Sequence, residues 1–139
     1  MKTIDKSQLS DLLEQGRTAL KNSYAPYSGF HVSCVIRLQD GRTLTGINIE
    51  NASYPVSLCA ERSAMAQVIS EGLQDLIHVV MVVTDSSPPA SPCGLCRQFL
   101  AEFIDENVLI VMANVNGEMN TSSIAELLPH AFNKKMFKC

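Results

Sequence analysis

Apolar positions along the chain alternate between a helical period and a strand-like period. Between about residues 6 and 21 they recur every three or four positions, which predicts an amphipathic helix capped by Asp5 or Thr3. The same period over Cys59–Glu71 predicts a second helix, because Gly72 suits the position just past its end.

Four segments have the pattern of β-strands. Residues 30–39 alternate between apolar and polar positions, residues 42–50 return as a second strand, and the Asp40-Gly41 pair between them favours a hairpin turn. Residues 76–84, "LIHVVMVVT", are almost continuously apolar, as expected of a central strand covered on both faces, and residues 107–115 show the same feature.

Helices and strands also alternate in the second half of the chain. After the proline-rich loop 85–92 helical spacing resumes near Cys93, and Asn116-Gly117 turns the chain before a short helix capped at Ser122 or Ser123. This order predicts an α/β fold in which helices cover both faces of one mixed sheet. We expect residues 1–139 to form a single domain, because the length and the hydrophobic content of 46% suit one ordinary domain.

The charge pattern argues against some classes of partner. The formal net charge is -3, and Lys134-Lys135 is the only adjacent basic pair, so a nucleic acid polymer is not expected as the main partner. The N-terminal segment lacks the apolar core of a secretory signal, and the longest apolar runs are too short to span a membrane. These features predict a soluble, cytoplasmic protein.

Five cysteines are the next feature, and their odd number argues against a disulfide framework. Cys93 and Cys96 are three positions apart, so both sulfurs can face one point in a first helical turn, which is a zinc half-site. Taken alone, this pair could equally be a redox pair or two small core residues. Cys34 is expected to be a buried thiol and Cys139 an exposed free one.

Cys59 is the natural third ligand, because it too lies at a predicted helix N-terminus, where backbone N–H groups favour a thiolate. Three thiolates leave one tetrahedral position open for a catalytic water, whereas structural zinc sites are normally closed by four protein ligands. Glu61 could move protons to and from that water, although a glutamate there could simply favour the first helical turn. Arg62 and Arg97 could offset the excess negative charge, or be ordinary exposed arginines.

These motifs resemble the cytidine deaminase family, in particular its small homotetrameric enzymes that act on free nucleosides. The resemblance lies in "CAER", "PCGLCRQ", "NIENASYP", "PYSGF" and "ELLPHAF", and it extends from about Leu9 to Phe132. It implies a three-layer α/β/α sandwich with a mixed five-stranded sheet. It also implies that Cys59, Cys93 and Cys96 hold zinc, and that Glu61 shuttles protons while an activated water attacks C4 of cytosine.

The resemblance further implies a set of residues that bind the nucleoside. Asn48 and Glu50 would hydrogen-bond the ribose hydroxyls, and Phe30 would pack on the base. The Ala60 backbone would help to read the pyrimidine, and Tyr54 and Phe132 would complete sites across subunit boundaries. From the residues alone, "NIENAS" could be a solvated polar loop, and Phe30 and Phe132 could be core residues.

The leading hypothesis is therefore zinc-dependent hydrolytic deamination of cytidine and 2'-deoxycytidine by a homotetramer, in pyrimidine salvage. One alternative is a deaminase for another aminopyrimidine, such as a nucleoside antibiotic. Another is a non-catalytic, zinc-stabilised interaction domain in which Cys34 or Cys139 supplies a fourth ligand. A polynucleotide editing enzyme is a further alternative, which the acidic balance disfavours.

Overall fold

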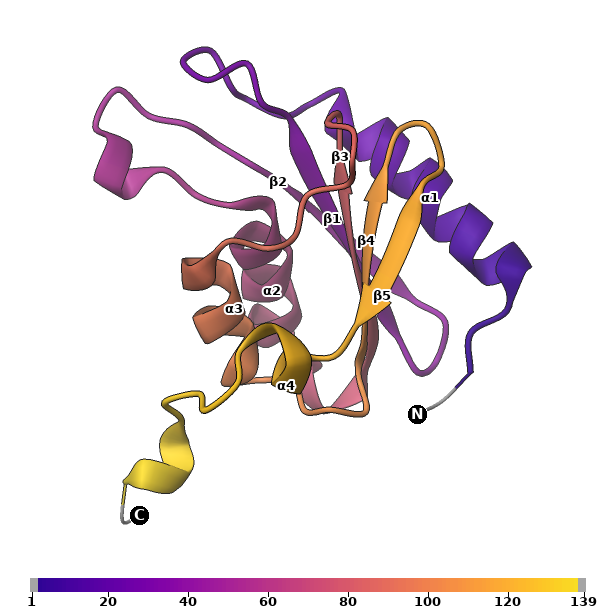
Figure 1. Ribbon diagram of the computed structural model, residues 1–139, viewed down its shortest axis with the longest axis vertical. Helices are drawn as coiled ribbons and strands as arrows, with labels where there is room; N and C mark the ends of the chain where they lie inside the picture. Colours follow the sequence, from indigo (N-terminus) through magenta and orange to yellow (C-terminus); the bar gives the residue numbers. More distant parts are fainter. Residues whose placement is uncertain (1–2, 138–139) are drawn as a thin grey trace.

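The computed structural model describes residues 3–137, and its centre is one five-stranded sheet with the strand order β2-β1-β3-β4-β5 (Figure 1). The strands are β1 (Val32–Leu38), β2 (Thr43–Ile47), β3 (Ile77–Thr84), β4 (Leu109–Asn114) and β5 (Met119–Ser122). Only β3 and β4 pair in parallel, and the other neighbours are antiparallel. The predicted hairpin, mixed sheet and central strand 76–84 are therefore confirmed.

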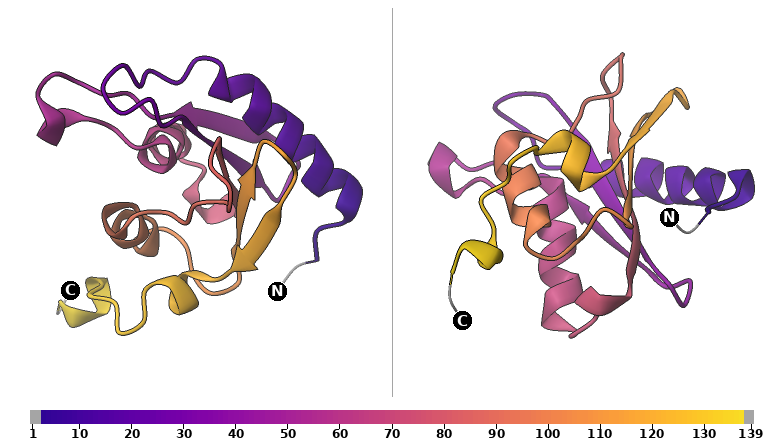
Figure 2. Two further views of the ribbon diagram at one scale, coloured as in Figure 1. Left: turned by 45° about the horizontal axis from the view of Figure 1, so that its top comes forward. Right: turned by 60° about the horizontal axis from the view of Figure 1, so that its bottom comes forward.

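Helix α1 (Lys6–Leu20) covers one face of the sheet, as Figures 1 and 2 both show. Leu12 and Leu13 of α1 pack on apolar side chains of β1, β3 and β4. The predicted cap is confirmed, because the Asp5 carboxylate accepts a hydrogen bond from the Gln8 N–H at 2.8 Å.

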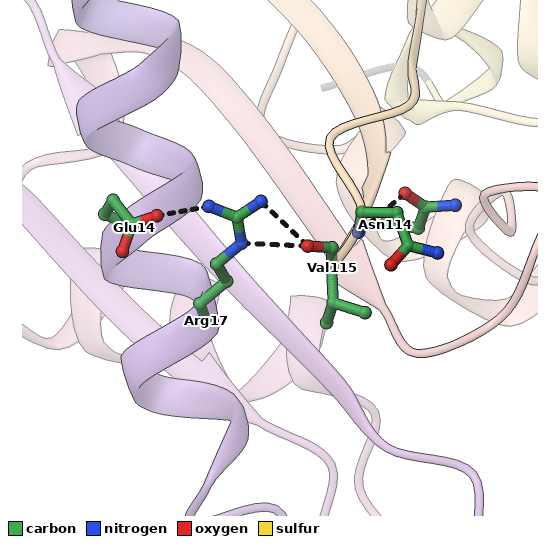
Figure 3. Close-up of polar contacts among 5 residues, drawn as sticks. Glu14, Arg17, Asn114 and Val115 are labelled. Carbon is green, nitrogen blue, oxygen red and sulfur yellow. Dashed lines mark hydrogen bonds and ion pairs between the residues drawn. The ribbon is translucent and has the colours of Figure 1, made fainter.

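A single arginine also ties α1 to the turn between β4 and β5. Arg17 donates to the carbonyl oxygen of Val115 from Nε at 3.0 Å and from Nη2 at 2.7 Å, and it pairs with Glu14 (Figure 3). This contact joins segments 98 residues apart, on the face of the sheet that α1 covers (Figure 1).

The other face is covered by α2 (Ala60–Ser70) and α3 (Gly94–Ala101), with the short α4 (Ile124–Leu127) beside α3 (Figure 2). Met65 and Leu100 are fully buried in this second core. Helices thus cover both faces of the sheet, as predicted.

Strand β5 is the element that the apolar pattern does not reveal. Three of its four residues are polar, and none of the four is fully buried. It forms because it pairs antiparallel with residues 110–113 of β4, a contact that local sequence cannot indicate. The second strand also ends earlier than expected, at Ile47, so residues 48–50 leave the sheet.

Gly46 in β2 allows the sheet to approach α2 closely. A Cβ atom there would lie 2.6 Å from the Ala60 carbonyl oxygen and 2.9 Å from the Ala64 Cα, and it would also contact the Ala64 nitrogen. We therefore expect Gly46→Ala to lower the free energy of unfolding by about 1–3 kcal/mol, since backbone must move to make room. Chemical denaturation measures this change.

The matched control for this substitution is Gly94→Ala in α3, where an added Cβ would meet no atom within 4 Å apart from its chain neighbours and the backbone of its own helix. Its free energy of unfolding should stay the same or rise slightly. Equal stabilities of the two variants would contradict the close packing of β2 on α2.

Candidate active site

The three candidate ligands meet where two helices begin. Cys59 and Cys93 are the N-cap residues of α2 and α3, both in extended backbone, and neither side chain caps its helix. Cys96 lies in the first turn of α3 and is buried. The three Sγ atoms all lie within 4.8 Å of one another. The fold therefore gathers one thiol from α2 and two from α3.

Sulfur spacing and charge both fit a zinc ion. Tetrahedral Zn–S bonds of about 2.3 Å place sulfurs roughly 3.8 Å apart, so only a small adjustment is needed. The neighbouring Cys96 thiol, together with Arg62, lowers the pKa of Cys59 to about 5, while the same interaction with Cys59 raises the pKa of Cys96. Cys59 therefore carries a thiolate that a divalent cation would neutralise.

Within residues 3–137, no fourth Cys, His, Asp or Glu lies close to all three sulfurs. Cys34 is fully buried in β1, as predicted, and does not join the group. Cys139 lies outside the described residues, so its expected exposure stays a prediction. The described residues thus provide the open, three-ligand arrangement that is typical of catalytic zinc.

Glu61 lies beside this group and is shielded from solvent. Its side chain is 4% exposed, and its Oε2 accepts a hydrogen bond from the Cys96 Sγ at 3.6 Å. Burial raises the pKa of this carboxyl group above its ordinary value, which makes the carboxylate a better proton acceptor. A glutamate that only favoured the first helical turn would be expected on the exposed side of the helix.

One cavity of about 240 Å³ connects the cysteines with the predicted nucleoside-binding residues. Phe30, Asn48, Glu50 and Ala60 line it, together with Glu61. Ser57, Thr84, Ala90 and Ser91 also line this cavity, and sequence reasoning did not identify them.

The family comparison matches this chain to a family model described as "Cytidine and deoxycytidylate deaminase zinc-binding region", over residues 6–112. The chain belongs to this deaminase family. The matched region contains all three cysteines and Glu61. Zinc is accordingly the metal that these three thiols bind.

Relatives and solved structures agree with the family. The chain is 39% identical over 121 residues to cytidine deaminase of Halalkalibacterium halodurans, covering 87% of this chain and 91% of that protein. It is 36% identical over 129 residues to cytidine deaminase of Mycoplasma genitalium, covering 93% and 98%. The crystal structure of cytidine deaminase from Burkholderia pseudomallei superposes with a TM-score of 0.84 at 35% identity, covering 88% and 98%.

The two arginines of this deaminase are placed differently. Arg62 Nη2 lies 4.0 Å from the Cys59 Sγ and donates to the Ser57 carbonyl oxygen at 3.0 Å, which suits charge compensation. Arg97 instead donates to the Pro92 and Leu127 carbonyl oxygens and to the Ser91 hydroxyl. No described hydrogen bond of Arg97 reaches a cysteine sulfur, so its predicted role in charge compensation stays a prediction.

Internal hydrogen bonds hold the residues predicted to contact the sugar. Asn48 donates from Nδ2 to the Phe30 carbonyl oxygen at 2.8 Å, and its Oδ1 accepts bonds from the Val32 N–H and the Ser23 hydroxyl. Residues 48–50 are therefore no freely solvated loop.

The Glu50 carboxylate is anchored in a similar way. It accepts bonds from the Tyr27 N–H at 2.9 Å and from the N–H of Ser28 at 3.1 Å, and the Ser28 hydroxyl also donates to it. Ser28 lies in the quoted "PYSGF" motif, but its contact with a residue 22 positions away depends on the fold.

Tyr54 and Phe132 lie away from the cavity within this chain. Tyr54 is 67% exposed and packs edge-on against Tyr27, and Phe132 is 61% exposed and packs edge-on against Phe137. Their role at a subunit boundary stays a prediction.

Proposed function

We propose that this protein deaminates cytidine and 2'-deoxycytidine by hydrolysis, giving uridine, 2'-deoxyuridine and ammonia. The observation that carries the proposal is the buried Glu61 carboxylate beside three clustered thiols, in a cavity that Asn48 and Glu50 also line. The family and the named relatives support the same reaction. Conversion of cytidine to uridine and ammonia by the zinc-loaded protein tests it.

The residues divide the chemistry between them. Cys59, Cys93 and Cys96 would hold zinc, which would supply an activated water as the nucleophile. Glu61 accepts one proton from that water and delivers it to N3 of the base, and it then accepts the remaining proton from the C4 hydroxyl and delivers it to the departing amino group. The water oxygen bonds to C4, the C4–N4 bond breaks, and the nitrogen leaves as ammonia, so the atoms balance. Arg62 offsets the negative charge of the thiolates.

Other lining residues bind the substrate. The Phe30 ring packs on the base, the Ala60 backbone reads the pyrimidine, and Asn48 and Glu50 hydrogen-bond the sugar hydroxyls. The internal hydrogen bonds of Asn48 and Glu50 support this role, because a pre-oriented polar group loses little entropy on binding.

We expect Glu50→Gln to raise the KM for cytidine by roughly 10–100-fold with a smaller change in kcat, since it removes a charged partner of the sugar. Ser28→Ala is the matched control, because it breaks an internal bond of Glu50 but keeps its charge. Steady-state kinetics should give Ser28→Ala the smaller increase. An unchanged KM in Glu50→Gln would exclude this sugar contact.

The cavity favours nucleosides over nucleotides. Among the described residues that line it, none is Lys, Arg or His, whereas Glu50 and Glu61 are acidic. A 5'-phosphate would enter without a cationic partner, which is unfavourable. This chemistry argues for cytidine rather than deoxycytidylate.

A second candidate substrate is a nucleoside antibiotic that carries an aminopyrimidine. The chain is 28% identical over 142 residues to blasticidin-S deaminase of Bacillus cereus, covering 96% of this chain and 99% of that protein. Parallel assays with blasticidin S and cytidine decide between the two substrates.

A homotetramer is part of the proposal. Exposed apolar side chains, among them Tyr54, Val56, Leu95 and Phe132, support burial between subunits, where Tyr54 and Phe132 would complete neighbouring sites. A fully active monomer in analytical ultracentrifugation would contradict this role.

In residues 3–137 no helix is long and apolar enough to span a membrane. The need for reduced thiols supports action in the cytoplasm, in pyrimidine salvage.

A further inference from the structure

Arg97 connects three parts of the chain near the zinc site. It lies on α3, four residues after Cys93. Its Nε donates to the Pro92 carbonyl oxygen at 2.7 Å, its Nη2 to the Ser91 hydroxyl at 2.8 Å, and its Nη1 to the Leu127 carbonyl oxygen at 2.7 Å. All three guanidinium nitrogens thus bond to oxygen atoms, two before Cys93 and one at the end of α4.

Among the three candidate ligands, Cys93 most needs such support. It is exposed and follows a loop without regular secondary structure, residues 85–92, whereas Cys96 is buried inside α3. Its side chain makes no capping bond to the helix. The position of its sulfur therefore depends on how Ser91 and Pro92 are held against α3.

We propose that Arg97 is a positioning residue for the zinc ligand Cys93. It fixes the backbone on the N-terminal side of Cys93 against α3 and against the end of α4, so that the Cys93 sulfur is already directed toward Cys59 and Cys96. This inference rests on the proposed three-cysteine zinc site. It assigns to Arg97 a geometric role in place of the charge compensation that its sequence spacing suggested.

Substitution of Arg97 by lysine or by glutamine distinguishes the geometric role from a charge effect. A guanidinium presents donors in a rigid planar fork, which matches three acceptors in three directions, whereas an ammonium is a point charge on a flexible stem. Arg97→Lys keeps the positive charge but loses the fork, and Arg97→Gln loses both. A charge effect is retained in the lysine variant, and a geometric effect is lost in both variants.

The test measures zinc affinity of the full-length protein by competition with a chromophoric chelator, independently of turnover. We expect Arg97→Lys and Arg97→Gln each to weaken zinc binding by about 10–100-fold, the effect typical of removing a residue that orients a metal ligand. Ser91→Ala, which removes one of the three acceptors, should weaken it less.

Arg17→Gln is the matched control. Arg17 also donates from two nitrogens to a backbone carbonyl (Figure 3), and its helix α1 lies on the face of the sheet opposite α2 and α3 (Figure 1), so its loss should affect stability but not zinc affinity. Thermal unfolding of the zinc-free proteins compares the stabilities of the Arg97 and Arg17 variants. If an Arg97 variant fails to fold, the zinc affinity of Ser91→Ala still tests the proposal.

Wild-type zinc affinity in Arg97→Lys, or in Ser91→Ala when the Arg97 variants do not fold, would overturn the proposal. So would an equal loss of affinity in Arg17→Gln. The proposed deaminase reaction fails separately, if zinc-loaded wild-type protein does not turn over cytidine. If Cys93→Ala bound zinc as tightly as the wild type, Cys93 would not be a zinc ligand, and the proposal would also be overturned.

Discussion

Glu61→Gln is expected to lower kcat for cytidine by about 10²–10⁴-fold while the zinc content and the fold stay unchanged. Glutamine has nearly the same shape, so it fills the same buried space between α2 and the cysteines. It cannot accept a proton from the water and return it to the substrate. Since burial penalises the ionised carboxylate, the free energy of unfolding should not fall.

Two measurements check this expectation, the decrease in cytidine absorbance and the zinc content of the purified variant. Glu102→Gln is the control, because it makes the same chemical change at an exposed glutamate. That variant should keep wild-type activity. If Glu61→Gln kept wild-type kcat, the carboxylate would not be the proton carrier.

Cys93→Ala is expected to lose zinc, and with it nearly all activity. Cys93 is exposed, so the substitution removes a metal ligand with little loss of packing. The zinc affinity should fall further than the roughly 10–100-fold typical of losing a residue that only supports a ligand. Metal analysis after dialysis against a chelator measures the loss, and added zinc should not restore turnover.

Cys34→Ala is the matched control for this prediction. Cys34 is a fully buried thiol outside the metal group, so its loss should destabilise the core slightly and leave zinc bound. This pair also tests the interaction-domain alternative, which needs a fourth ligand. Loss of zinc from Cys34→Ala would support that alternative and contradict the three-ligand site.

The sequence predicted those parts of the site that depend on local geometry. Cys93 and Cys96 lie within one helical turn, and Cys59 lies at a similar helix start, so their chemistry could be recognised before the fold was known. Among the described residues, helical and strand periods likewise indicated each α-helix and each strand except β5, which is polar and depends on β4 as its partner.

The remaining parts depend on contacts between distant segments. Sequence spacing placed Arg97 near Cys93. The direction of its side chain depends on a hydrogen bond to the carbonyl oxygen of Leu127, 30 residues away. The anchoring of Glu50 by Ser28 is also a product of the fold. Tyr54 and Phe132 are exposed in this chain, so their predicted roles depend on a second subunit.

The most direct test of the proposed function is incubation of the zinc-loaded, wild-type protein with cytidine. Uridine and ammonia should form in equal amounts, and Glu61→Gln should remove this activity without removing the metal. Absence of uridine and ammonia with fully zinc-loaded protein would contradict the assignment of the site as a cytidine deaminase.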